Sequence, residues 1–256
     1  MDYQYLSSVV GGAGGDGYRR ARAAAREAVR DWAVGALREV VDGTRPIRAV
    51  THPLGFTCLP VERAGRAGVC VHLWSPRVRG TAPTTSAIHA HGWQLTSHVL
   101  FGSLVNSLMV VADAERPRPG AQLPGGGGLP GGLDAPYDDR ARGLYRVLEV
   151  RSEGDVDELV PTPRYVRCLP GQSHVLSGGD VYSVAAGVFH ATEVRPDAEA
   201  ATVALGQTVP GLPDRTLGPP NSDLHRVRRR RCDRDQTVQI ARIILDRLLA
   251  ATTCPA

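Results

Sequence analysis

The stretch IHAHGWQLTSHVLFGSL, residues 88–104, is the most informative part of this 256-residue chain. It places His89 and His91 two residues apart on a predicted β-strand. Alternate residues of a strand project to the same face, so both imidazoles can converge on one point. A metal-binding pair is one interpretation of this spacing, and a pair of exposed or hydrogen-bonded histidines is the other.

A second stretch, GDVYSVAAGVFHATEV at residues 179–194, contains His190 after a turn that ends at Gly187. A third imidazole on a later strand would complete a facial set of three nitrogen ligands, which leaves positions open for substrate and oxygen. His174, in a predicted turn just before this stretch, is an alternative third ligand. Otherwise it is a surface histidine or one that contacts substrate.

Short β-rich runs surround both stretches and are separated by Gly and Pro. Such a series is typical of an antiparallel sandwich or barrel. No alternation of strands and helices suggests a parallel α/β sheet. The runs are residues 55–60, 69–74, 86–91, 97–111, 144–150, 165–169, 181–186 and 201–205.

Helices are predicted on both sides of the β-rich part, at residues 17–42 and 235–250, where apolar side chains recur at helical spacing. The first prediction ends at Gly43 and Pro46, which are helix stop signals. The expected organisation is a helical extension, a β-barrel with a flexible Gly/Pro-rich insertion, and an Arg-rich connector with a C-terminal helix. The corresponding ranges are 1–46, 47–210 with the insertion at 116–136, and 211–256.

Composition narrows the class of protein. The chain has 42% apolar residues but no apolar run long enough to cross a membrane, and its polar, Gly-rich N-terminus predicts no secretory signal. Five cysteines without a C-x-x-C spacing fit a reducing, cytoplasmic environment. Because the basic cluster at 226–231 lacks an aromatic platform, it predicts a solvated or salt-bridged segment, and nucleic acid is not expected as a partner.

The two histidine stretches resemble the two cupin motifs, G-x5-H-x-H-x3–4-E-x6-G and G-x5-P-x-G-x2-H-x3-N. The resemblance covers roughly residues 53–206. It implies a mainly β chain with the cupin fold, a double-stranded β-helix or jelly-roll barrel, here with added N-terminal and C-terminal α-helices. The positions that keep the motif intervals are His89, His91, Gly102, Gly179, Gly187 and His190.

Departures from the cupin pattern point to one branch of the family. Leu95 stands where many cupins have a glutamate ligand. Three histidines without the glutamate are similar to the cysteine dioxygenase-like thiol dioxygenases, which use non-haem Fe(II). That resemblance implies Fe(II) at His89, His91 and His190, with Ni or Zn in a purified sample. Thr96 lies where the animal enzymes have a cross-linked cysteine, so no such cross-link is expected.

Four residues are candidates for substrate binding. The resemblance suggests Arg63 for the substrate carboxylate. Trp93 either lines the pocket or packs at a barrel end, and His72 either lines the barrel or is a packed core histidine. His174 is the fourth candidate, if it contacts substrate.

Two residues are candidates for a catalytic role. Tyr182 could donate a hydrogen bond to bound oxygen or substrate, with structural packing as its other interpretation. His98 lies an odd number of residues after His91, which favours the opposite strand face if the strand is continuous. A bend at Gly92 would instead let His98 line the pocket or orient a ligand.

The expected function is therefore a cytoplasmic oxygenase that uses O2 on a small thiol or sulfur-containing amino acid, in specialised metabolism such as antibiotic biosynthesis. The resemblance allows a homodimer formed through the added helices, and no membrane partner is expected. One alternative is a non-redox Zn or Ni cupin that acts as an isomerase, a lyase or a small-molecule-binding protein. Another is a metal-dependent sensor whose Arg-rich segment touches nucleic acid.

Overall fold

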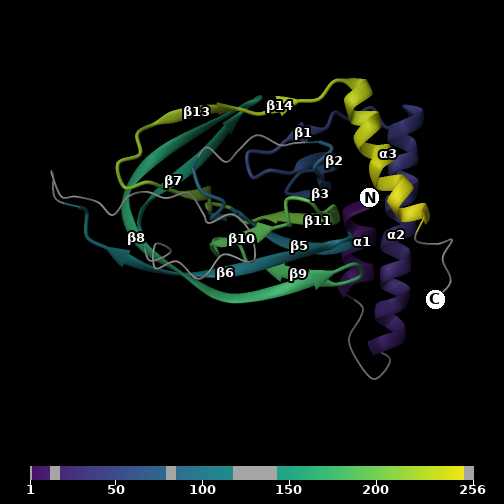
Figure 1. Cartoon of the computed structure of the whole chain (residues 1–256), viewed down its shortest axis with the longest axis horizontal. Helices are drawn as coiled ribbons and strands as arrows, with labels where there is room; N and C mark the ends of the chain where they lie inside the picture. The colour runs from purple at the N-terminus through teal and green to yellow at the C-terminus, as the bar shows by residue number, and fades with distance from the viewer. Residues whose placement is uncertain (1, 12–17, 79–84, 118–142, 251–256) are drawn as a thin grey trace.

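Two antiparallel sheets and a layer of helices make up the computed structural model of this chain (Figure 1). It describes residues 2–11, 18–78, 85–117 and 143–250. The predicted insertion at 116–136 lies outside the described residues from position 118 onward. Within the described ranges, no helix is both long and apolar enough to span a membrane. The expectation of a mainly β chain with terminal helices is confirmed.

Three helices lie together on one side of the sheets: α1 (Asp2–Gly11), α2 (Tyr18–Asp42) and α3 (Arg234–Ala250). The bounds of α2 and α3 agree with the predicted helices to within one residue. The start of α3 is fixed by reciprocal bonds, because Gln236 N donates to Asp233 Oδ1 and Asp233 N donates to Gln236 Oε1. The sequence did not predict α1, because its neighbourhood is polar and rich in glycine.

The first sheet carries the helices on one of its faces. Leu59, Val71 and Val203 are buried on that face and pack with Leu37 and Ile244 of α2 and α3. Alternate residues on the same strands face the second sheet. In the order β14-β1-β2-β3-β11-β5-β9, the strands are β14 (Arg230–Arg231), β1 (Val50–Thr51), β2 (Thr57–Ala64), β3 (Ala67–Trp74), β11 (Ala200–Thr208), β5 (Trp93–Phe101) and β9 (Val181–Val184).

The second sheet curls back on itself, since its long strand β8 pairs with β6 on one side and with β7 on the other. This curl encloses a separate core that includes Val166, Phe189 and Leu217. In the order β13-β8-β6-β10-β4-β12-β7, the strands are β13 (His225–Arg228), β8 (Val156–Ser177), β6 (Ser103–Ala114), β10 (His190–Glu193), β4 (His89–Ala90), β12 (Asp214–Gly218) and β7 (Leu144–Glu153).

The sheets extend beyond the predicted barrel segment 47–210. Strands β12, β13 and β14 lie in the stretch expected to be a connector, where they pair with β4, β7, β8 and β1. Because these strands are rich in charged residues, they lack the apolar alternation from which a strand is predicted. Ion pairs accompany the pairing of β13 with β8, since Arg226 and the adjacent Arg229 lie 3.0 and 3.2 Å from Glu158 and Asp157. The expectation of a salt-bridged segment agrees with these pairs.

Two neighbouring leucines of α3 test how the helical layer is held. Leu248 is 2% exposed in the core, whereas Leu249 is 41% exposed. We expect Leu248→Ala to lower the free energy of unfolding by about 3 kcal/mol, because the substitution leaves a cavity among packed side chains. The matched control Leu249→Ala should change it by less than about 0.5 kcal/mol. Urea unfolding followed by circular dichroism measures both, and equal losses would contradict this packing.

Candidate metal centre

Three histidine side chains converge between the two sheets. His89 lies on β4, His91 directly follows that strand, and His190 begins β10. Their ligand nitrogens all lie within 4.8 Å of one another. The ring centroid of His89 is 4.7 Å from that of His91 and 4.3 Å from that of His190. This group could hold a metal ion.

Strand alternation produces the convergence. His89 and His190 are directly paired across β4 and β10, so their side chains leave the sheet together. Their chain neighbours project to the other face, where Ala90 and Ala191 are 1% exposed in the core of the second sheet. The His-x-His spacing brings His91 to the same side as His89. The apolar residues beside the histidines thus fix which way the imidazoles point.

Two glycines shape the turns beside the histidines. A Cβ at Gly92 would collide with the carbonyl oxygen of Leu212, so only glycine fits this close approach. Gly92 N donates to Asp214 Oδ1 at 2.6 Å, which ties the turn after His91 to β12. Gly187, at φ +80°, donates its N–H to the His91 carbonyl oxygen at 2.8 Å. The turn before His190 is therefore joined to the turn after His89.

Backbone carbonyls and ring stacking orient the imidazoles. The Nδ1 of His89 lies 2.9 Å from the Ala87 carbonyl oxygen, and the Nδ1 of His190 lies 3.3 Å from that of Val188. A carbonyl only accepts, so both Nδ1 atoms are donors, and each Nε2 keeps its lone pair for a cation. The ring of His91 stacks on Trp93 with centroids 3.9 Å apart.

Burial keeps the three imidazoles neutral. Desolvation lowers the pKa of His89 to about 4 and that of His190 to about 3. The pKa of His91 lies well below its usual value, mainly through burial and then through its histidine neighbours. A neutral imidazole is the form that ligates metals. The three neutral imidazole nitrogens therefore form a donor set that fits a transition-metal cation.

The centre opens into a cavity of about 610 Å³ between the sheets. Four of the predicted site residues line this cavity: Arg63, His72, Trp93 and Tyr182. Arg63 is exposed, and the other three are partly buried. The Tyr182 hydroxyl hydrogen-bonds with Ser97 and Thr192, and burial raises its pKa, so the phenol stays protonated.

Two predicted site residues lie elsewhere. His98 is 4% exposed and faces the helical layer, where it contacts the small space lined by Leu6 and Val29. The strand alternation continues through the turn at Gly92, since Trp93 and Ser97 line the cavity and His98 therefore points away. His174 is exposed on β8 and does not line the cavity. Of the alternatives left open by the sequence, the structure therefore has the opposite strand face for His98 and a surface position for His174.

The cavity also contains residues that the sequence did not single out. His52 stacks on Phe56 with ring centroids 4.4 Å apart, and burial lowers the pKa of His52 to about 3. Asp214 holds the Gly92 turn, and Cys58 and Cys70 lie on the wall formed by β2 and β3. No local pattern marks these positions, although Cys70 and His72 do share the two-residue spacing of His89 and His91.

No protein-family model matches the chain, and no curated protein matches its sequence. The class is therefore defined by the fold and the site. The chain is a mainly β protein of two antiparallel sheets with terminal helices, and it carries a three-histidine group that could bind metal. These features are compatible with a cupin.

Removing one imidazole tests the ligand set. We expect His89→Ala to lose the metal that the wild-type chain takes up at this centre, because two nitrogen donors remain where three are needed. Far-ultraviolet circular dichroism should stay unchanged. His174→Ala, on an exposed position of the same sheet, is the matched control and should keep the wild-type metal content. Elemental analysis measures both, and full metal retention in His89→Ala would refute the assignment.

The lowered pKa values predict a pH dependence of the metal-free protein. The folded histidines protonate only near pH 4 or below, whereas in the unfolded chain they protonate near 6.5. The unfolded state therefore binds more protons between these values, and the free energy of unfolding falls as pH drops from about 6.5 to about 4. His190→Gln should flatten this slope, and His174→Gln should not. Urea titrations across this pH range measure the free energy of unfolding. Equal slopes for wild type and His190→Gln would contradict the lowered pKa of the buried His190.

Proposed function

We propose that this chain is a cupin-type, mononuclear non-haem Fe(II) oxygenase that acts with O2 on a small sulfur-containing amino acid or derivative. The observation that carries the proposal is the convergence of three neutral imidazoles on one wall of a cavity between two sheets. Leu95 supports it further, because it lines the same cavity where the cupin pattern has a glutamate ligand. No carboxylate is therefore supplied from that position.

The ligand charge explains the preference for a thiol. When bound, Fe(II) supplies redox chemistry and lowers the pKa of a coordinating thiol. His89, His91 and His190 contribute no negative charge, so the cation's full 2+ charge remains to attract an anionic ligand such as a thiolate. A facial set of three donors also leaves room for a second small ligand.

Arg63 is suited to hold a substrate carboxylate. It lies on β2, it lines the cavity, and it is exposed to solvent. A guanidinium binds a carboxylate with two parallel hydrogen bonds, which would fix the orientation of an amino acid whose thiol points to the histidines. The cavity volume of about 610 Å³ is ample for a small amino acid with water.

Tyr182 and Trp93 shape the space beside the imidazoles. The Tyr182 hydroxyl hydrogen-bonds with Ser97 and Thr192, and Thr192 donates its own hydroxyl hydrogen to Asn106 Oδ1 at 3.2 Å. This chain holds the phenol in one position on the cavity wall. Trp93 covers one face of the His91 ring and keeps water from it. Both residues would limit solvent around a reacting substrate.

The experiment is anaerobic reconstitution with Fe(II), followed by exposure to isotopically labelled O2 and one thiol at a time. We expect oxygen uptake and labelled product with at least one of cysteine, cysteamine or mercaptopropionate, and no oxygen uptake with cysteine sulfinate as the already oxidised control. Turnover without O2 in the Zn or Ni protein would instead identify a non-redox cupin. No oxygen uptake with any thiol would refute the oxygenase.

Arg63→Ala separates carboxylate recognition from the chemistry. We expect it to raise KM for cysteine by about ten-fold, because a charge-assisted hydrogen bond is lost. Cysteamine has no carboxylate, so its KM should not change. An equal change in KM for both substrates would show that Arg63 does not bind the substrate carboxylate.

A further inference from the structure

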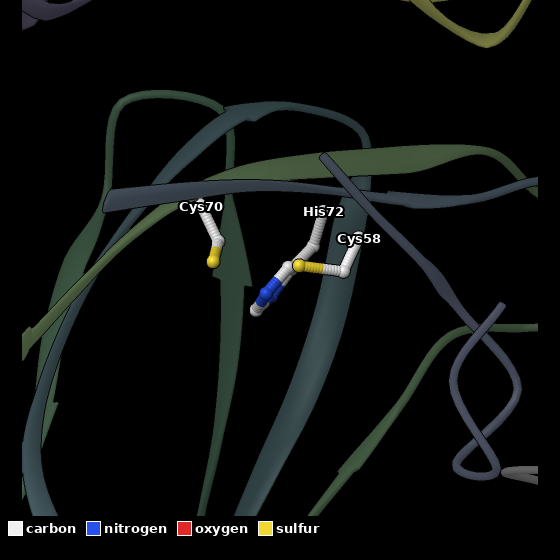
Figure 2. Close-up of side chains that lie close together, drawn as sticks. All are labelled: Cys58, Cys70 and His72. Carbon is white, nitrogen blue, oxygen red and sulfur yellow. The ribbon is translucent and has the colours of Figure 1, made fainter. Parts of the chain in front are cut away.

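A second group of metal-ligand side chains lies on the opposite wall of the cavity. It consists of Cys58 on β2 with Cys70 and His72 on β3, and none of its members belongs to the three-histidine group. Its three ligand atoms all lie within 4.8 Å of one another. Figure 2 shows the side chains projecting from the same face of the two strands.

The register of β2 and β3 builds this group. Cys58 is directly paired with His72, and Cys70 is paired with Pro60 one alternation further along. Cys70 and His72 point to the same side because they lie two residues apart. The residues between them point the other way, where Leu59 and Val71 are fully buried against the helices. The ligand atoms are therefore held by two packed strands, not by a loop.

The thiols contact one another and the imidazole. Cys70 hydrogen-bonds with both Cys58 and His72. All three residues line the cavity, and both cysteines are free and only partly buried. A cation entering the cavity can therefore reach two sulfurs and one nitrogen without any rearrangement of the strands.

We infer that Cys58, Cys70 and His72 form a second metal site, which takes a thiophilic cation such as Zn(II) and presents an open fourth position to the cavity. Thiolates together with imidazole favour Zn(II), and two cysteines with one histidine is a known ligand set of zinc sites that keep a position for water or substrate. On binding, each thiol releases its proton to solvent.

A disulfide between the two cysteines fits the geometry less well. Cys58 faces His72 directly, and Cys70 lies on the diagonal. Diagonal positions of neighbouring strands are about 7–8 Å apart, which is at the upper limit of the span that a disulfide bridges, and both cysteines are free in the structure. The register therefore favours a shared cation over a covalent bond.

The test uses Co(II) as a substitute for Zn(II), added under anaerobic conditions to the reduced full-length chain. Sulfur ligands give Co(II) a thiolate charge-transfer absorption that nitrogen ligands do not, so the signal reports only on the cysteine site. We expect this band to appear in wild type and to disappear when Zn(II) is added. We also expect it to persist in His89→Ala, which makes the result independent of the proposed function.

Substitutions identify the ligands. Cys58→Ser and Cys70→Ser should lose the band while the cobalt at the three-histidine centre remains. Cys168→Ala, a buried cysteine in the other sheet, is the control that should keep the band. If a serine variant fails to fold by circular dichroism, His72→Gln replaces it, and a weakened or shifted band is expected.

Three outcomes would overturn the inference. The first is the absence of a thiolate band in reduced wild type, and the second is a band that survives both serine substitutions. The third is a Cys58–Cys70 disulfide, found by peptide mass spectrometry in the untreated protein, together with no band after reduction.

Discussion

The backbone pairing of His89 with His190 is the constraint on which the candidate centre depends. It joins two short strands whose alternate residues are small and apolar, so burial of Ala90 and Ala191 on one face requires both imidazoles to enter the cavity on the other. A slip of one residue would exchange the two faces and place imidazoles in an apolar core. The hydrophobic effect in the second sheet therefore sets the positions of polar ligands that form no part of that core.

Burial of the three imidazoles disfavours their protonation and favours metal binding. It makes protonation of the imidazoles unfavourable, which is why the pKa values of His89 and His190 fall to about 4 and 3. The same loss of hydration keeps the imidazoles in the neutral form that ligates a cation. A ligand that binds only the folded state adds to its stability, so a metal bound by the three imidazoles would raise the free energy of unfolding.

The sequence predicted what depends on local periodicity. The two long helices, most strands of the β-rich part and the three histidines follow from spacing along the chain. The sequence did not predict β12, which supplies Asp214 to the Gly92 turn, because its five residues carry no apolar alternation and depend on pairing with β4 and β7. The face on which His98 lies also could not be predicted from its local sequence. Its local sequence allowed either face, and only the continued alternation through Gly92 turned it toward the helices.

The cavity places two donor sets of different chemistry on facing sheets. The second sheet and the turn after β4 present three nitrogens, whereas β2 and β3 present two sulfurs and one nitrogen. Imidazoles bind Fe, Ni and Zn alike, but thiolates discriminate strongly in favour of thiophilic cations. The proposed cysteine site would therefore select a thiophilic cation, whereas the three imidazoles by themselves do not select between Fe(II) and Zn(II). The proposed cysteine site would also bear on the proposed oxygenase, because a cation bound there would occupy two protein thiols that line the same cavity as the three histidines.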